Sequence, residues 1–135
     1  MKQVFVLGLA AFALVVSSAT SPLTAQGGAG PSYTEEQSTR GEGIYTKTCS
    51  FCHEDQSMAP ALKGDGFLKN WSDKTAGALF DKIQMTMPAN EPGSLNEQQA
   101  ADLIAFILKQ NKFPAGQQPL PKDAASLGAI ALTPK

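Results

Sequence analysis

The residues with the clearest chemical meaning in this chain are Cys49, Cys52 and His53, in the run Cys-Ser-Phe-Cys-His. Two thiols three positions apart can each add to one vinyl group along the same side of a porphyrin, which forms two thioether bonds. The imidazole that follows immediately then falls over the iron as an axial ligand. This spacing is typical of covalent attachment of c-type haem, and it predicts one haem held by these three residues.

Other kinds of site remain open for the same residues. A thioredoxin-like dithiol also has two cysteines at this spacing, but it stands on a strand-rich α/β fold, and no segment here alternates as a strand. A structural disulfide between cysteines this close would constrain the unfolded chain little. A zinc site usually has four ligands, and besides Cys49 and Cys52 the chain has a single histidine, His53. Haem attachment is therefore the favoured interpretation.

A second axial ligand is expected from Met58, Met85 or Met87. Met58 follows His53 so closely that it would have to pass round the haem edge. Met85 falls on a predicted helix, where a methionine is commonly a core residue. Met87 comes just after that helix, and Pro88 favours an extended backbone there, so the Met87 sulfur can reach over the ring. We predict Met87 as the distal ligand, with Met85 as the alternative and an open iron as a third possibility.

Ligation by histidine and methionine would saturate the iron, and the soft thioether would favour the ferrous state. An iron with no vacant position suits electron transfer better than reaction with oxygen or peroxide. The sequence thus predicts a one-electron carrier that is not an enzyme. Two other functions stay open, namely an open-iron haem enzyme or sensor such as a small peroxidase, and a fixed haem subunit of a dehydrogenase complex.

Helices are expected on both sides of the haem-attachment run. Thr34, followed three residues later by Gln37, has the form of a capping box and predicts a helix from residue 35 to about residue 48. A second helix is expected from Thr75 to about Met85, because apolar residues recur there at helical spacing.

The clearest helix signal lies near the end of the chain. Ser94, with Glu97 three residues later, predicts a capping box and a helix over about residues 95–110, whose apolar residues form one broad stripe. Residues 50–74 are expected to be mainly loop, because they contain several helix-breaking residues. The apolar side chains expected to surround the porphyrin are Phe51, Leu62, Trp71, Leu79, Phe80 and Ile83.

The N-terminal residues 1–25 are predicted to be a cleaved signal peptide. A positive end, Met1-Lys2, precedes an uninterrupted apolar run over residues 4–16, and small residues follow, with cleavage after Ala19 or Ala25. An apolar run this short would span a bilayer poorly, so no stable membrane insertion is expected after cleavage. The predicted location is the periplasm.

The rest of the chain is expected to form one small domain. Residues 26–33 are rich in glycine and predict a flexible leader, residues 34–112 the haem domain, and residues 113–135 a proline-containing extension that is either wrapped over the domain or frayed. The formal net charge is −1 with 17% charged residues. Because no basic block or basic-aromatic stripe is present, nucleic-acid binding has no electrostatic support.

The order of these features resembles the class I bacterial cytochromes c over residues 34–111. The shared features are the capped first helix, the run Cys-Ser-Phe-Cys-His, the segment Ala-Pro-Ala-Leu-Lys-Gly, the Thr-Met-Pro turn and the final helix Ala-Asp-Leu-Ile-Ala-Phe-Ile-Leu. The resemblance implies an all-α class I cytochrome c fold, with three to five helices around a covalently bound haem c and its iron.

The resemblance also implies roles for individual residues. Gly41 would let the first and last helices cross closely, with Tyr45 packed against the last one. The carbonyl of Pro60 would accept a hydrogen bond from His53 and orient it as the iron ligand. Trp71 would pack on the haem or donate its indole N–H to a propionate.

The run from Thr86 to Gly116 is similar to small cytochromes and haem domains associated with quinoprotein alcohol dehydrogenases. This similarity implies a quinoprotein dehydrogenase as the electron donor and a terminal oxidase pathway as the acceptor. The expected protein is a monomer that meets these redox partners in turn.

Overall fold

The computed structural model of the protein describes residues 32–54 and 58–134. Six α-helices lie in these two segments, in the order α1 (Glu35–Thr48), α2 (Ser50–His53), α3 (Asp65–Trp71), α4 (Ala76–Thr86), α5 (Glu97–Gln110) and α6 (Ala124–Gly128). In the described residues the only extended pairings are two isolated bridges, Tyr33 with Ala115 and Thr75 with Ala131. The all-α prediction is confirmed, with one helix more than the largest number expected.

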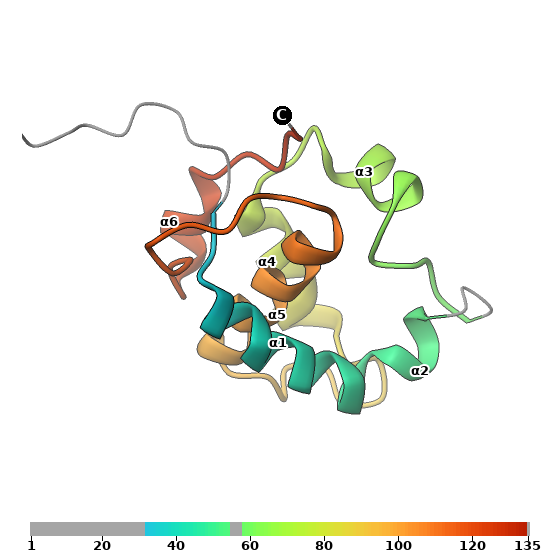
Figure 1. Ribbon diagram of the computed structural model, residues 1–135. Coiled ribbons are helices and arrows are strands. Elements are labelled where there is room, and N and C mark those ends of the chain that lie inside the picture. The colour runs from blue at the N-terminus through green and yellow to red at the C-terminus, as the bar shows by residue number, and fades with distance from the viewer. Residues whose placement is uncertain (1–31, 55–57, 135) are drawn as a thin grey trace, which may run out of the picture.

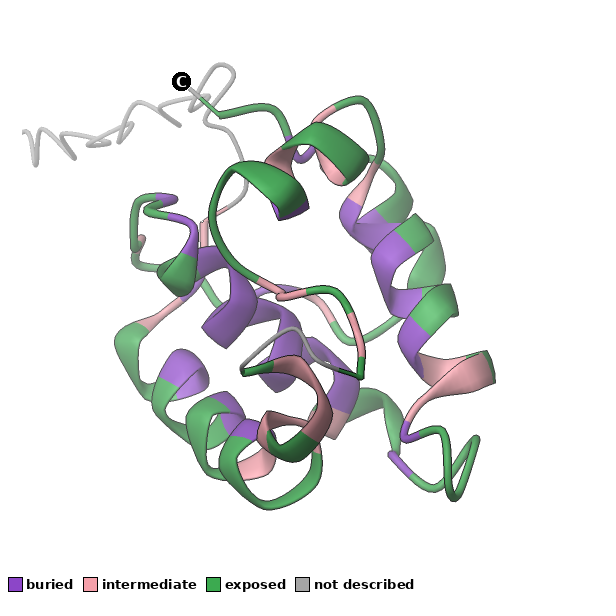
Figure 2. Cartoon of the chain, turned by 90° about the vertical axis from the view of Figure 1, so that its right-hand side faces the viewer, coloured by how far each residue is buried: buried purple, intermediate pink, exposed green. Residues whose placement is uncertain are grey.

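The core is built on α5. Its residues from Ala100 to Leu108 are all buried, α1 packs across it, and α4 lies against it as well. Figure 2 shows the buried residues running along α5 and along the inner faces of α1 and α4. In Figure 1, α2 and α3 lie on the side of the domain opposite α6. No helix in the described part of the chain combines the length and apolarity needed to cross a bilayer.

The crossing of α1 and α5 depends on Gly41. A Cβ atom added to this glycine would lie 1.9 Å from the carbonyl oxygen of Asp102 and 2.9 Å from the Cβ of Phe106. The two backbones are therefore closer than any other residue type at position 41 would allow. One turn later, Tyr45 packs its ring on Phe106, with the ring centroids 5.0 Å apart. The close helix crossing expected at Gly41 and Tyr45 is confirmed.

A buried carboxylate next to this crossing was not expected from the sequence. Asp102 is 3% exposed and accepts two hydrogen bonds from the Arg40 guanidinium, at 2.7 and 2.9 Å, and one from Gln98 at 2.9 Å. The hydrogen bond to Asp102 raises the pKa of Arg40. The bidentate pair fixes the rotation of α1 relative to α5.

We expect Arg40→Met to lower the free energy of unfolding by about 2 kcal/mol, because the Asp102 carboxylate would stay buried with Gln98 as its remaining partner. Denaturant unfolding of the haem-loaded protein measures the change. The matched control is the double variant Arg40→Met with Asp102→Leu, which removes the buried charge and should recover part of the loss. A single variant as stable as wild type would show that the pair contributes nothing.

The helix boundaries agree with the predictions at α1 and α4 and correct the one at α5. α1 begins as predicted, with the Thr34 hydroxyl accepting from the Gln37 N–H. α4 begins after Thr75 and ends within one residue of the predicted end. α5, however, is capped by Asn96 rather than Ser94, and its capping box is completed by Gln99. With Asn96 as the cap, Leu95 directly before it is buried in the core.

The segment expected to be mainly loop contains α3. This helix begins after Gly64, whose φ of 76° places it in the left-handed region. Gly66 lies inside the helix, so its weak helix propensity is overcome by tertiary packing. Phe67 is buried, and its ring stacks on that of Trp71 one turn later, with centroids 6.1 Å apart.

Both ends of the domain are packed more tightly than the sequence suggested. Tyr33, which we placed in the leader, is 2% exposed and donates a hydrogen bond to the carbonyl of Phe113. The rest of the predicted leader, residues 26–31, and the predicted signal segment lie outside the described residues. The buried side chain of Gln37 donates to the Leu120 carbonyl at 3.1 Å and accepts from its N–H at 2.8 Å.

The C-terminal extension wraps over the domain. Leu127 on α6 and Leu132 are both almost completely buried, and α6 packs against α4. The backbone of residues 74–76 also bonds to the extension, with Ala76 N–H donating to the carbonyl of Ile130. The extension thus covers the start of α4, on the side of the domain away from α2 (Figure 1).

Candidate functional site

The two thiols and the histidine are gathered by a single helical turn. Cys49 ends α1 and begins α2, and its carbonyl accepts the backbone N–H groups of Cys52 and His53 at 3.2 and 3.0 Å. Both cysteines are free thiols, and both are partly buried. The turn therefore presents two sulfurs and an imidazole within one short segment, as covalent attachment of a porphyrin requires.

The state of the Cys49 thiol bears on the dithiol alternative. Burial, and then the nearby Cys52, raises the pKa of Cys49 to about 11. Redox-active dithiols have at least one thiol with a lowered pKa, because the thiolate is the attacking species. A protonated, half-buried Cys49 is a poor nucleophile for disulfide exchange.

His53 is held in one orientation by the loop that follows it. Its Nδ1 lies 2.6 Å from the carbonyl oxygen of Pro60. Because a carbonyl can only accept, Nδ1 carries a proton, so in the tautomer that can bind a metal the lone pair is on Nε2. The contact expected between His53 and Pro60 is present, and it leaves Nε2 as the nitrogen that could bind iron.

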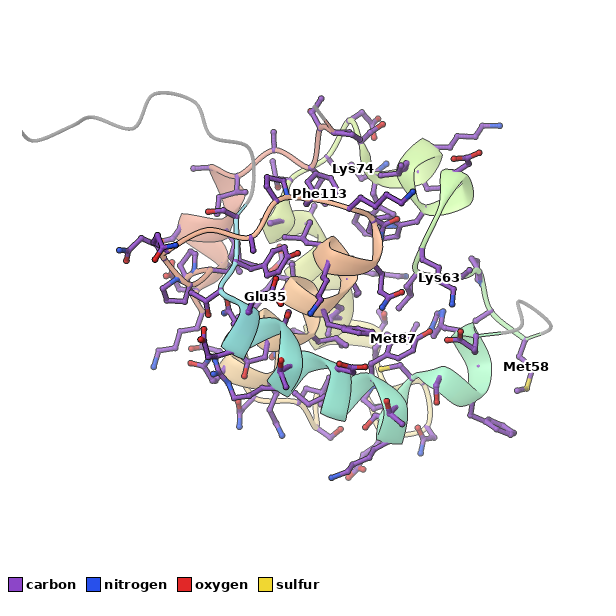
Figure 3. All side chains as sticks on the ribbon, viewed as in Figure 1. Glu35, Met58, Lys63, Lys74, Met87 and Phe113 are labelled. Carbon is purple, nitrogen blue, oxygen red and sulfur yellow. The ribbon has the colours of Figure 1, made fainter. Side chains whose placement is uncertain are left out.

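The three candidate methionines differ in their surroundings. Met58 and Met85 are 56% and 69% exposed, whereas Met87 is half-buried. Met87 has the expected extended backbone, with φ −125° and ψ 148°, at the end of α4. Figure 3 shows Met58 pointing outwards at the edge of the molecule and Met87 inside its outline. The expectation that Met85 belongs to the core was wrong, because the last turn of α4 turns this side chain to solvent.

The apolar side chains expected around the porphyrin divide into two groups. Leu79, Phe80 and Ile83 on α4 are buried, and Leu62 and Trp71 pack on the core while remaining partly exposed. Phe51 is 81% exposed and contributes nothing to the protein core, so its packing on the porphyrin stays a prediction. The single turn of α2 buries none of its own residues, and it directs Phe51 away from the domain.

Trp71 lies at the end of α3. Besides stacking on Phe67, its ring lies 5.6 Å from the ammonium nitrogen of Lys74. These contacts hold the indole between Phe67 and Lys74. Packing on the haem, or a hydrogen bond from the indole N–H to a propionate, stays a prediction.

Three residues beside His53 form a polar bridge that the sequence did not indicate. Glu54 accepts a hydrogen bond from the Tyr45 hydroxyl at 3.0 Å and forms an ion pair with Lys63. The hydrogen bonds from Lys63 and Tyr45 lower the pKa of the Glu54 carboxyl, while burial and then Glu54 raise the pKa of Tyr45. The bridge joins α1 to both sides of the loop that carries Pro60.

A pocket of about 240 Å³ lies beside this polar bridge. It is lined by the three bridge residues and by apolar groups that include Leu62 and Phe106. Neither His53 nor Met87 lines it, so it is distinct from the place where these two could face one iron.

Together these residues fit a covalently bound haem. Two free thiols can form the thioether bonds to the porphyrin, and an imidazole hydrogen-bonded at Nδ1 and a half-buried thioether are the axial ligands of a six-coordinate c-type haem. The hydrogen bond at Nδ1 is the contact that commonly fixes a metal-binding histidine.

A family model described as cytochrome C oxidase, cbb3-type, subunit III matches residues 36–107. This match spans α1 to most of α5, and thus includes both thiols, His53 and Met87. No curated protein and no solved structure matched the chain. Since the match covers more than half of the 135 residues, the chain belongs to this family of class I cytochrome c domains, which carry covalently bound haem c.

Proposed function

We propose that this protein is an exported one-electron carrier that works in the periplasm. Cys49 and Cys52 would hold the haem through thioether bonds, and His53 and Met87 would be the axial ligands of its iron. When bound, the haem supplies a reversible one-electron couple. The observation that carries the proposal is the hydrogen bond between His53 Nδ1 and the Pro60 carbonyl, because it prepares Nε2 for a metal.

The protein's own residues would keep the site unchanged during electron transfer. The extended backbone at Met87 is tied to α4 by a hydrogen bond of 2.9 Å from its N–H to the Ile83 carbonyl, so the thioether has a fixed starting point. His53 is held in the same way through Pro60. Two bound axial ligands would leave no position on the iron for oxygen or peroxide, which supports a carrier rather than an enzyme.

We expect Met87→Ala to remove the weak long-wavelength absorption band of methionine-ligated ferric haem completely and to lower the midpoint potential. The reason is that loss of the soft thioether removes a ligand that favours ferrous iron. The matched control is Met85→Ala, which shortens an exposed methionine two residues away and should leave both readouts unchanged. Loss of the band in Met85→Ala but not in Met87→Ala would exchange the two assignments.

Carbon monoxide distinguishes the carrier from an open-iron enzyme or sensor. The wild-type ferrous protein is expected to bind it slowly or not at all, because both axial positions are filled, whereas Met87→Ala should bind it rapidly. Rapid binding by the wild type would contradict the proposed ligation by methionine and favour an enzyme or sensor.

As partners we propose a quinoprotein dehydrogenase as the donor and a terminal oxidase pathway as the acceptor. The similarity of residues 86–116 to small cytochromes and haem domains associated with quinoprotein alcohol dehydrogenases supports the donor. The matching family, a cbb3-type oxidase subunit III, supports an oxidase pathway as the acceptor. A monomeric carrier should form small, transient contacts with each partner. Co-purification with a dehydrogenase at high salt would instead indicate a fixed haem subunit.

A further inference from the structure

The loop that presents the Pro60 carbonyl is anchored on both sides. Before Pro60, the Ala59 N–H donates to the carbonyl of Cys52 at 3.2 Å, which ties the loop to the haem-attachment turn. After Pro60, the chain reaches Gly64, where α3 begins. The position of the Pro60 carbonyl relative to His53 therefore depends on what holds residues 62–64.

The backbone of Leu62 and Gly64 is held by the side chain of Asn111, at the end of α5. Its amide nitrogen donates to the Leu62 carbonyl at 2.9 Å and to the Ile107 carbonyl at 2.8 Å, and its amide oxygen accepts the Gly64 N–H at 2.9 Å. Two carbonyls face the nitrogen and one N–H faces the oxygen, so this orientation of the amide satisfies every group. Asn111 is 8% exposed, which makes these bonds expensive to replace with water.

We propose that Asn111 is a positioning residue for the axial histidine. It joins the rigid end of α5 to the loop, keeps the Pro60 carbonyl on His53 Nδ1, and so sets how strongly His53 donates to the iron. The polar bridge from Glu54 to Lys63 is a second tie on the same loop, but it is exposed and screened by water. The proposal rests on the proposed ligation of iron by His53.

The hydrogen bond at His53 Nδ1 affects the equilibrium between ferric and ferrous haem. A strong hydrogen bond from Nδ1–H to a carbonyl makes the imidazole a better donor, which stabilises ferric iron. Without the Asn111 amide, the Leu62 carbonyl and the Gly64 N–H lose their partner and the loop moves away from His53. The ring proton of His53 then exchanges faster, and the equilibrium shifts towards ferrous haem.

The test is Asn111→Leu in the haem-loaded protein, because leucine has a similar volume and no amide. We expect exchange of the His53 Nδ1–H with deuterium, followed by NMR of the ferrous protein, to become about tenfold faster. The midpoint potential should rise while the long-wavelength band persists. If the leucine variant does not fold, the second variant is Asn111→Ser, which is neutral and too small to overpack the site. We expect the same faster exchange and higher potential from it.

The matched control is Gln37→Leu. Gln37 is also a buried amide, and it makes two hydrogen bonds to the backbone of the distant residue Leu120. The segment that carries Leu120 does not hold the Pro60 loop. It should lower the melting temperature as Asn111→Leu does, and leave the His53 exchange rate and the potential unchanged. Equal effects of the Asn111 and Gln37 variants on all three readouts would overturn the proposal.

The result separates this inference from the proposed function. A wild-type protein without a low-spin haem spectrum would mean that His53 and Met87 are not the ligand pair. A normal wild-type spectrum, together with an unchanged exchange rate and potential in Asn111→Leu and Asn111→Ser, would reject the positioning role alone.

Discussion

Replacing both haem-attaching cysteines, Cys49→Ser with Cys52→Ser, should leave a polypeptide that carries no covalent haem and is largely unfolded. The burial of α2 and α3 shows why this part of the domain depends on the cofactor. α2 buries none of its residues, and α3 buries only Phe67. The segment over residues 50–74 thus has little apolar core of its own, and in a domain of this size such a deficit is usually met by a metal, a disulfide or a cofactor.

Haem staining of a denaturing gel measures the covalent attachment, and circular dichroism with a thermal melt measures folding. The matched control is Ser50→Ala, which removes an exposed hydroxyl between the two cysteines and keeps their spacing. It should retain haem and melt as the wild type does. A haem-free double variant with a cooperative melt and native helix content would show that the haem is not needed for folding.

Gly41→Ala is expected to lower the free energy of unfolding by about 3 kcal/mol or more. The added methyl group would lie 1.9 Å from the Asp102 carbonyl oxygen, and this neighbour is backbone that no rotamer change can move. α1 would have to shift away from α5, which would weaken the packing of Tyr45 on Phe106 and the bidentate pair between Arg40 and Asp102.

The control for this prediction lies two residues further along the same helix. A Cβ atom added to Gly43 would have no neighbour within 4 Å, so Gly43→Ala should stabilise the protein by about 0.5–1 kcal/mol through helix propensity. Denaturant unfolding of both haem-loaded variants measures the difference. If Gly41→Ala were as stable as Gly43→Ala, the close crossing of α1 and α5 would be refuted.

Local signals in the sequence predicted three helices well, because capping and apolar periodicity depend on neighbouring residues. Thr34 caps α1 as expected, and α4 begins one residue after the predicted start, with Thr75 as its cap. At α5 two polar residues compete, and Asn96 rather than Ser94 is the cap, with Leu95 buried in the core of the folded domain. α3 was missed because Gly66 weakens the local signal, although Phe67 and Trp71 at helical spacing were a usable clue.

Contacts between distant residues explain what the sequence could not predict. Gln37 was expected to complete a capping box, but its side chain bonds to Leu120, 83 positions away. The pair between Arg40 and Asp102 and the three hydrogen bonds of Asn111 are of the same kind. The contact between His53 and Pro60 could be expected only because the family resemblance implied it.

The crossing of α1 and α5 has a consequence for the order in which the protein matures. Asp102 lies 62 positions after its partner Arg40, so the two helices can meet only after a long loop has closed, which is entropically slow. Cys49 and Cys52 both lie inside that loop. During this delay the thiols lie in a segment without fixed tertiary contacts, so we expect their reaction with the porphyrin to begin before the helix pair has closed.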